Sequence, residues 1–422
     1  MPSTSTELSR ANNVDDYRWL TGPQAAEFLA ISSASPRSLA AEIKHLRRAL
    51  SAERAHLIVE LVELRRRAQD KFALAGQMFF TRRGLEQATD EIVAGYKALR
   101  FAQAGKVIDL CAGVGGDLLA LANVVSTTGL DRDPIMVTIA QANARVAQEQ
   151  TLAGRTAEPV DVRVQDVADA NVQHCSAWHI DPDRRPSGRR TTRVALHEPG
   201  VETLERLRAA NPNAAIKLAP AAELPETWSG EAELEWIGRS RQCRQLVAWF
   251  GELAISPGER RATILGSQTS LVRTIVGTAL EEPKPVGRVG RFVFEPDATV
   301  LAAQLGGALA AEHDLARITR GIAYWTGDAP IDDAALACFE VHAVLPLDVK
   351  RVRDVLAARN IGRLEIKKRG VDCQPESLRR QLRPTGSEAG TLLVTRIEGR
   401  VTAIIAQRRP ATMPSSDAAD SA

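Results

Sequence analysis

The chain has 422 residues, of which 44% are hydrophobic and 25% charged, and its 54 Lys and Arg nearly balance its 52 Asp and Glu. This length predicts two to three domains, while the net charge of +2 is too small to indicate a nucleic-acid partner on its own. No apolar run approaches the roughly 20 residues of a membrane-spanning helix, and the polar N-terminus lacks the features of a secretory signal, so we expect a cytoplasmic protein with no membrane partner.

Residues 1–100 predict a helical N-terminal domain. From about residue 23, segments such as SLAAEIKHLRRAL place apolar residues three and four positions apart, and the alternation typical of strands is missing. The last part, Met78–Phe101, contains Thr89 and Asp90 within a helix-forming run that leads into a different pattern.

Residues 101–265 predict an α/β unit. Strand-like segments alternate with helical ones from Lys106 onward, through VIDLCAGVGGDLLALA, TTGLDRDPIMVTIAQANARVAQ, VDVRVQDVAD, CSAWHIDPDRR and NAAIKLAP. Such alternation predicts a mostly parallel sheet with helices on both faces.

The remaining residues predict a smaller second module. Residues 266–336, which Pro283 and Pro285 punctuate, read as a connector with modest structure. Residues 337–409 predict a compact α+β domain in the order strand, helix, strand, helix and closing hairpin. The small, polar residues 410–422 predict a disordered tail.

The segment VIDLCAGVGGD is the most informative in the chain, because an acid, Asp109, stands just before a glycine loop. A phosphate-binding loop of the dehydrogenase kind remains an alternative, but such loops favour backbone N–H donors over a carboxylate aimed at the ligand. Asp131 follows the next strand-like segment, where it could hold two ribose hydroxyls, and Asp166 follows the third. Acids at successive strand ends suit a positively charged nucleoside that carries no phosphate.

On these residues the sequence resembles the class I S-adenosylmethionine-dependent methyltransferases, which implies a Rossmann-like core. The resemblance implies that the glycine loop with its acid holds the methionine part of the cofactor, that Asp131 binds ribose, and that the third acid lies at the adenine. Cys111 stands where the family usually has its first glycine. The cofactor-binding candidates of this region are Asp109, Cys111, Gly113, Gly115, Gly116, Asp131, Arg132, Asp166 and Val167.

The fourth strand-like segment ends in Asp181-Pro182, at the position that faces the methyl group in these enzymes. Members that methylate amines commonly carry an aromatic residue there, which this chain lacks, although Asp181 and Pro182 can still position an acceptor. The alternative is that Asp181 only caps its loop. We expect in-line transfer to a positioned nucleophile.

The five cysteines indicate neither a metal site nor covalent catalysis. They lie at least 35 residues apart, so neither zinc-ligand spacing nor a disulfide framework is present, and we expect no metal. A cytosine C5 methylase would need a nucleophilic cysteine near Asp181 or at the next strand end, which reads Lys217-Leu218-Ala219-Pro220.

Basic residues gather in two places. Arg184 and Arg185 follow Asp181-Pro182, and residues 341–400 hold 13 Lys and Arg against 7 Asp and Glu. Within that range Lys367, Lys368 and Arg369 predict a phosphate-contacting turn. The alternative in both places is a solvated surface in an arginine-rich protein.

Together with these motifs, GLEQAT before the glycine loop and the C-terminal IGRLEIKKRGVD resemble bacterial and archaeal methyltransferases that carry a small α+β THUMP-like domain, over most of residues 60–409. The resemblance implies RNA binding, frequently of tRNA, and a cofactor lid that contains Glu86, Gln87 and Thr89. The sequence therefore predicts a class I methyltransferase that modifies a nucleotide, favouring nitrogen, in structured RNA such as tRNA or rRNA. A small-molecule methyltransferase and a non-catalytic RNA-binding scaffold remain alternatives, and the oligomeric state is open.

Overall fold

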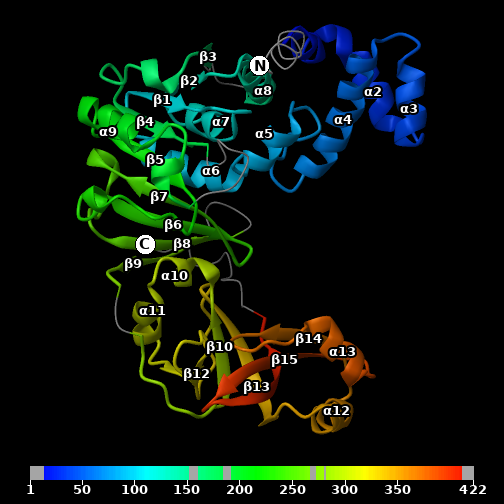
Figure 1. Cartoon of the computed structure of the whole chain (residues 1–422), viewed down its shortest axis with the longest axis vertical. Coiled ribbons are helices and arrows are strands. Elements are labelled where there is room, and N and C mark those ends of the chain that lie inside the picture. The colour runs from blue at the N-terminus through cyan, green and yellow to red at the C-terminus, as the bar shows by residue number, and fades with distance from the viewer. Residues whose placement is uncertain (1–13, 152–159, 184–191, 267–271, 280–281, 411–422) are drawn as a thin grey trace, which may run out of the picture. The chain divides into compact units, whose positions relative to one another are not determined.

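The structure is a computed structural model that describes residues 14–151, 160–183, 192–266, 272–279 and 282–410 (Figure 1). The chain divides into two compact units. The first comprises residues 1–234, 245–258 and 265–271, and the second comprises residues 235–244, 259–264 and 272–422. The predicted tail, apart from Pro410, lies outside the described residues.

The first unit begins with helices, as the spacing of apolar residues predicts. They are α2 (Pro23–Ala34), α3 (Leu39–Leu46), α4 (Ala52–Ala68), α5 (Arg82–Gln87) and α6 (Glu91–Ala98). The buried apolar side chains of α2 to α5 belong to one cluster, which Val114 and Ile139 of the α/β part also join, so these helices share a core with the sheet region. The run that contains Thr89 and Asp90 is not one helix, because Asp90 accepts a bond from the Val93 amide at 3.1 Å and caps the start of α6.

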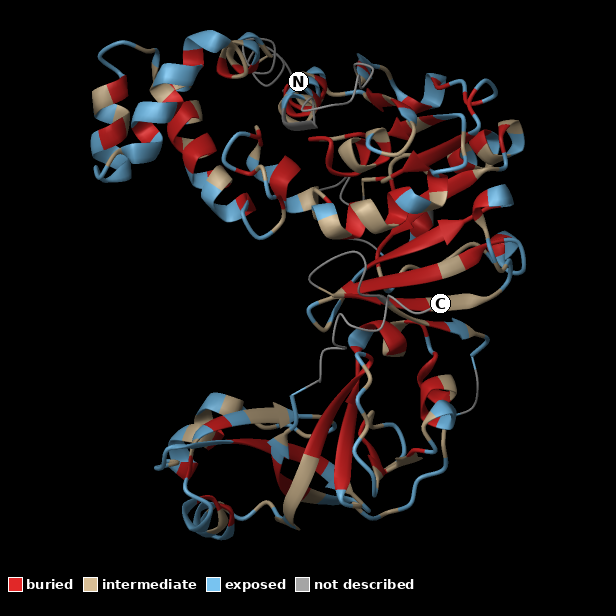
Figure 2. Ribbon diagram, turned by 180° about the vertical axis from the view of Figure 1, so that it is seen from behind, coloured by how far each residue is buried: buried red, intermediate tan, exposed pale blue. Residues whose placement is uncertain are grey.

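A parallel sheet follows, as predicted. Its strands lie in the order β3-β2-β1-β4-β5, with β7 antiparallel beside β5, and the connecting helices are α7, α8 and α9. The bounds are β1 (Lys106–Leu110), α7 (Gly116–Ala122), β2 (Ser126–Asp131), α8 (Pro134–Thr151), β3 (Asp161–Val164), β4 (Ala177–Ile180), α9 (Val201–Ala210), β5 (Ala214–Leu218) and β7 (Gln242–Trp249). Every residue of β4 and β5 is buried, as Figure 2 shows in red, which is typical of strands covered on both faces.

The strand order reverses between β1 and β4. Leu110 at the end of β1 pairs with Leu130 of β2 on one side and with Ile180 of β4 on the other. The carboxyl ends of these strands therefore meet at one edge, where open α/β sheets form a ligand crevice.

The remaining strands of this part of the chain are β6 (Glu233–Arg239), β8 (Arg260–Leu265) and β9 (Val272–Gly277). Short 3-10 helices are η1 (Leu99–Phe101), η2 (Val167–Asp169), η3 (Val194–Leu196), η4 (Glu226–Trp228) and η5 (Gly251–Leu253).

The second unit contains a sheet in the order β11-β12-β10-β13-β16-β15-β14. Its bounds are β10 (Phe292–Pro296), α10 (Ala298–Ala302), α11 (Gly306–Glu312), β11 (Ala316–Arg317), β12 (Trp325–Gly327), β13 (Leu336–Pro346), α12 (Val349–Ala358), β14 (Ile361–Lys368), α13 (Pro375–Leu382), β15 (Glu388–Ile397) and β16 (Arg400–Arg408). From β13 onward the elements follow the predicted order and end in the β15–β16 hairpin. Val352, Leu356, Leu378 and Leu382 pack α12 and α13 against that sheet.

Residues 266–336 are more than the predicted connector, because β10, β11 and β12 belong to the same sheet as the C-terminal module. Strand β10 pairs with β13 from Phe292 to Pro296 and is buried throughout. The nearby Pro and Gly residues conceal this short apolar strand in the sequence.

In the part of the chain that the structure describes, no helix is long and apolar enough to cross a bilayer.

Candidate active site

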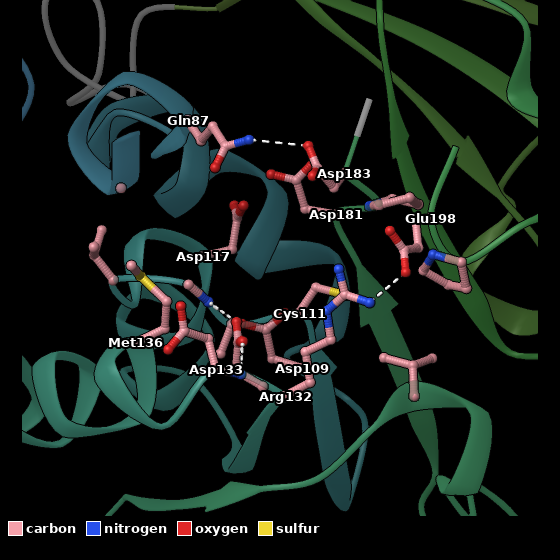
Figure 3. Close-up of a pocket in the computed structure, with 18 of the residues that line it drawn as sticks. Gln87, Asp109, Cys111, Asp117, Arg132, Asp133, Met136, Asp181, Asp183 and Glu198 are labelled. Carbon is pink, nitrogen blue, oxygen red and sulfur yellow. Dashed lines mark hydrogen bonds and ion pairs between the residues drawn. The ribbon is translucent and has the colours of Figure 1, made fainter. Parts of the chain in front are cut away.

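A cavity of about 530 Å³ opens in the first unit at the carboxyl ends of β1, β2 and β4 (Figure 3). It is lined by residues of helix α5, the glycine loop, the end of β2, helix η2 and the segments after β4. Among the lining residues are nine carboxylates: Glu86, Asp109, Asp117, Asp131, Asp133, Asp166, Asp181, Asp183 and Glu198. Since Arg83 and Arg132 are the arginines in that lining, the cavity wall favours a cationic ligand.

The glycine loop turns through left-handed backbone. Gly113 and Gly115 have φ of 56° and 94°, and Cys111 has φ of 63°. Glycine adopts this region freely, whereas a side chain costs roughly 1–2 kcal/mol, so Cys111 keeps the loop geometry at some strain. At Gly116 the reason for glycine is space, because a Cβ would lie 2.9 Å from the Thr89 carbonyl oxygen.

Asp109 presents a buried carboxylate at the end of β1. Its Oδ1 lies 2.7 Å from His179 Nδ1 of the neighbouring strand β4. Its Oδ2 has no hydrogen-bond partner among the described residues, although the residue is only 1% exposed. Burial raises the pKa of Asp109 despite the bond from His179. An unpartnered buried carboxylate oxygen beside a cavity is suited to an incoming N–H donor.

Asp131 is held by the backbone at the end of β2. Its Oδ2 accepts from the Gly113 amide and its Oδ1 from the Asp133 amide, each at 2.9 Å. Burial raises the pKa of Asp131, and these two donors only partly oppose it. The next residue, Arg132, is exposed and pairs with Glu198 across the cavity, as the dashed line in Figure 3 shows.

Asp166 and Val167 lie beyond β3. The exposed Asp166 accepts from the Ala168 amide at 2.8 Å and thereby caps η2. Val167 is 5% exposed and offers an apolar surface to the cavity.

Asp181 is fixed by a buried lysine. Its Oδ2 lies 2.5 Å from Lys217 Nζ of β5, and Lys217 Nζ also donates to Thr89 Oγ1 at 2.7 Å. Thr89 in turn donates to Asp117 Oδ2 at 2.7 Å. Asp181 is thus tied through Lys217 to the segment between α5 and α6 and to the start of α7.

A second buried lysine continues this network towards Asp109. Lys97 Nζ lies 2.7 Å from Asp117 Oδ1 and 3.4 Å from His179 Nε2. Burial lowers the pKa of Lys97, against the attraction of Asp117. Burial acts to raise the pKa of Asp117, but Lys97, His179 and Lys217 outweigh it and hold that pKa well below its ordinary value. We call Lys97, Asp117, Lys217 and Thr89 the lysine network.

Helix α5 is joined to the segment after β4. Asp183 accepts from Arg83 Nη2 at 2.5 Å and from Gln87 Nε2 at 3.1 Å. Gln87 therefore spans one side of the cavity in Figure 3, while Glu86 lines the cavity and is exposed.

The cavity brings together most of the residues that the sequence singled out. Gly115 is the exception in the glycine loop, since it caps α7 without lining the cavity. The lining includes Glu86, Gln87, Thr89, Asp109, Cys111, Gly113, Gly116, Asp131, Arg132, Asp166, Val167, Asp181 and Pro182. Arg184 and Arg185 lie outside the described residues.

Sequence reasoning missed four polar residues at this site. His179 and Lys217 interrupt the otherwise apolar strand segments AWHI and AAIKL, a signal that could have marked them as buried and partnered. Asp117 closes the glycine motif itself, and Lys97 lies in the apolar helix α6.

The three basic candidates of the second unit have different surroundings. Lys367 Nζ lies 2.9 Å from Glu295 Oε2, and Arg369 Nη2 lies 3.2 Å from Glu295 Oε1. Glu295 is 6% exposed, so these two cations balance a buried acid. Lys368 is exposed.

Comparisons with known proteins point in one direction. Residues 336–408 match a family model described as THUMP domain-like. Uncharacterized S-adenosylmethionine-dependent methyltransferases of Mycobacterium tuberculosis, strains CDC 1551 and H37Rv, are each 34% identical over 364 residues, covering 83% of this chain and 95% of the relative. The crystal structure of a candidate methyltransferase from Porphyromonas gingivalis W83 has a TM-score of 0.72 at 19% identity and covers 91% of this chain and 99% of that one, which is a likeness of fold.

Proposed function

The chain belongs to the family of S-adenosylmethionine-dependent methyltransferases, and we propose that the group it methylates is a nitrogen atom of a nucleotide in structured RNA such as tRNA or rRNA. The THUMP-like domain at residues 336–408 is the observation that carries the RNA substrate. The excess of Lys and Arg in residues 341–400 supports the same substrate class.

The cofactor is S-adenosylmethionine, and the cavity residues suit its chemistry. The unpartnered Oδ2 of Asp109 is suited to accept from the amino group of the methionine part, because that group is the cationic donor a buried carboxylate needs. Asp131, fixed by two backbone amides, would accept from the ribose hydroxyls, and Val167 would contact the adenine. We also propose that the glycine loop holds the methionine part of the cofactor. The segment that contains Glu86, Gln87 and Thr89 would cover the cofactor as a lid.

Asp181 is the residue we assign to the methyl acceptor. Bound S-adenosylmethionine supplies an electrophilic methyl group on a sulfonium. Lys217 occupies Oδ2 of Asp181, and Oδ1 has no partner among the described residues, so Oδ1 can accept an N–H of the acceptor amine. The lysine network fixes the carboxylate before substrate arrives, and the amine would then direct its lone pair to the methyl group.

Methyl transfer to RNA can be measured directly. Purified protein is incubated with methyl-labelled S-adenosylmethionine and, separately, with tRNA, rRNA or a small-molecule extract. We expect label in one RNA fraction, and Asp181→Ala should reduce incorporation about 10²-fold while S-adenosylmethionine still binds. Asp169→Asn, an exposed acid outside the cavity lining, is the control.

Other outcomes discriminate among the alternatives. Label in the small-molecule fraction alone would replace RNA by a small acceptor. Binding of S-adenosylmethionine without label in any fraction would favour the scaffold. Full incorporation by Asp181→Ala would reduce Asp181 to a residue that caps its loop.

A further inference from the structure

A basic groove lies between helices α12 and α13 of the second unit, which are neighbours in Figure 1. It has a volume of about 570 Å³ and is lined by Val349, Arg353, Ser377, Arg380, Gln381 and Arg383. Three of these residues are arginines, two are neutral hydrogen-bonding residues, and none of the described lining residues is acidic. We call Arg353, Arg380 and Arg383 the groove arginines.

The groove arginines differ from the basic residues of the adjoining sheet. On the sheet, Lys367 and Arg369 pair with Glu295, and Arg408 lies 2.9 Å from Glu365. All three groove arginines are exposed, and none pairs with a carboxylate of a described residue. Their charges are therefore unpaired among the described residues of the second unit.

Local structure also prepares the groove. Arg353 Nε and Nη2 donate to the carbonyl oxygens of Leu382 and Gln381 at 3.2 and 2.6 Å, which satisfies the end of α13 and fixes the guanidinium. Arg383 caps α13 with a φ of 46°, a left-handed position where helices usually carry glycine. An arginine at that position retains strain that glycine would remove.

We propose that this groove binds the phosphodiester backbone of the RNA, a proposal that rests on the RNA substrate proposed above. Arginine presents a planar fork that matches phosphate oxygens, and Ser377 and Gln381 add neutral donors beside it. A lipid surface fits less well, because Val349 is the apolar residue among the described lining. Phosphate contacts of this kind orient an RNA without reading its bases.

The proposal is tested on the full chain with total tRNA as the probe. The double variant Arg380→Gln with Arg383→Gln removes two charges and keeps Arg353, which supports α13. We expect the slope of log Kd against log salt to fall by about two, because each lost phosphate contact retains about one counterion. The control double variant Arg351→Gln with Arg359→Gln also removes two exposed charges, one within α12 and one at its C-terminal end. Neither residue lines the groove, so the slope of this variant should change much less.

The salt dependence of tRNA binding separates failure of the groove proposal from failure of the proposed RNA substrate. If wild type binds tRNA but the groove variant has an unchanged slope, or one reduced as much as in the control, the groove proposal is wrong and the RNA substrate stands. If wild type binds no tRNA or rRNA at low salt, both are wrong. Competition by duplex DNA tests whether the groove prefers the phosphates of RNA to those of DNA. Equal competition by polyglutamate would show that the partner is an acidic protein instead. Unaltered binding of S-adenosylhomocysteine by the variants checks that the chain is folded.

Discussion

The cavity of the first unit and the groove of the second both depend on charged side chains, but they use them in opposite ways. Beside the cavity, Lys97 and Lys217 are 2% and 7% exposed and pair with the lining residues Asp117 and Asp181. In the groove, the arginines are exposed and have no acidic partner among the described residues. A buried charge that loses its partner destabilises the fold, whereas an exposed unpaired charge costs little and remains available for a ligand.

The largest expected effect on stability comes from breaking the lysine network. Asp117→Asn removes the carboxylate that pairs with Lys97, and leaving a buried cation uncompensated typically costs about 3–5 kcal/mol. Urea unfolding would measure it, with Asp169→Asn as the exposed control. A loss below about 1 kcal/mol would mean that the buried lysines are neutral or find other partners.

A smaller loss of stability is expected from Asp333→Asn in the second unit, where Asp333 pairs with Arg273 and His313. The pKa of Asp333 is lowered. Burial acts to raise this pKa, but the Ala335 amide, His313 and Arg273 outweigh burial. Its ionised form therefore stabilises the fold above the unfolded value of roughly 4, and this contribution is lost as pH falls through the lower folded pKa. Asp333→Asn should cost about 2 kcal/mol at pH 7.

The measurement is denaturant unfolding across pH. The difference between Asp333→Asn and wild type should shrink on acidification below about pH 4. A difference that is independent of pH would assign the loss to packing.

Asp109 should behave in the opposite sense. Since burial raises its pKa, ionisation of Asp109 costs stability as pH rises from the unfolded value towards the folded pKa. Asp109→Asn should leave the cofactor-free protein unchanged or up to about 1 kcal/mol more stable at pH 7. Thermal unfolding without ligand measures this, and a marked loss of stability would show that the charge supports the fold.

The smallest effect is expected in the groove. Arg380→Gln with Arg383→Gln should change the free energy of unfolding by less than about 0.5 kcal/mol, because neither side chain has an ionic partner among the described residues. A larger loss in urea unfolding would mean that the groove arginines are structural.

Local patterns predicted the parallel sheet and the acids at its edge, because alternation and strand ends are visible in a short window of sequence. They did not reveal the partner of Lys217, because Asp181 and Thr89 come from distant segments that only the fold brings together. The same limit applies to Lys367 and Arg369, which the pattern predicts to be free for phosphate but which share Glu295 of strand β10. That strand was itself concealed by neighbouring Pro and Gly.

Calorimetric titration of wild type and Asp109→Asn with S-adenosylmethionine and S-adenosylhomocysteine, with NAD as a control, tests the central claim most directly. We predict that wild type binds both compounds and not NAD, and that folded Asp109→Asn binds at least about tenfold more weakly, since a charge-assisted hydrogen bond contributes roughly 1.5–3 kcal/mol. Equal affinity of the two proteins would contradict the assignment of Asp109 to the cofactor.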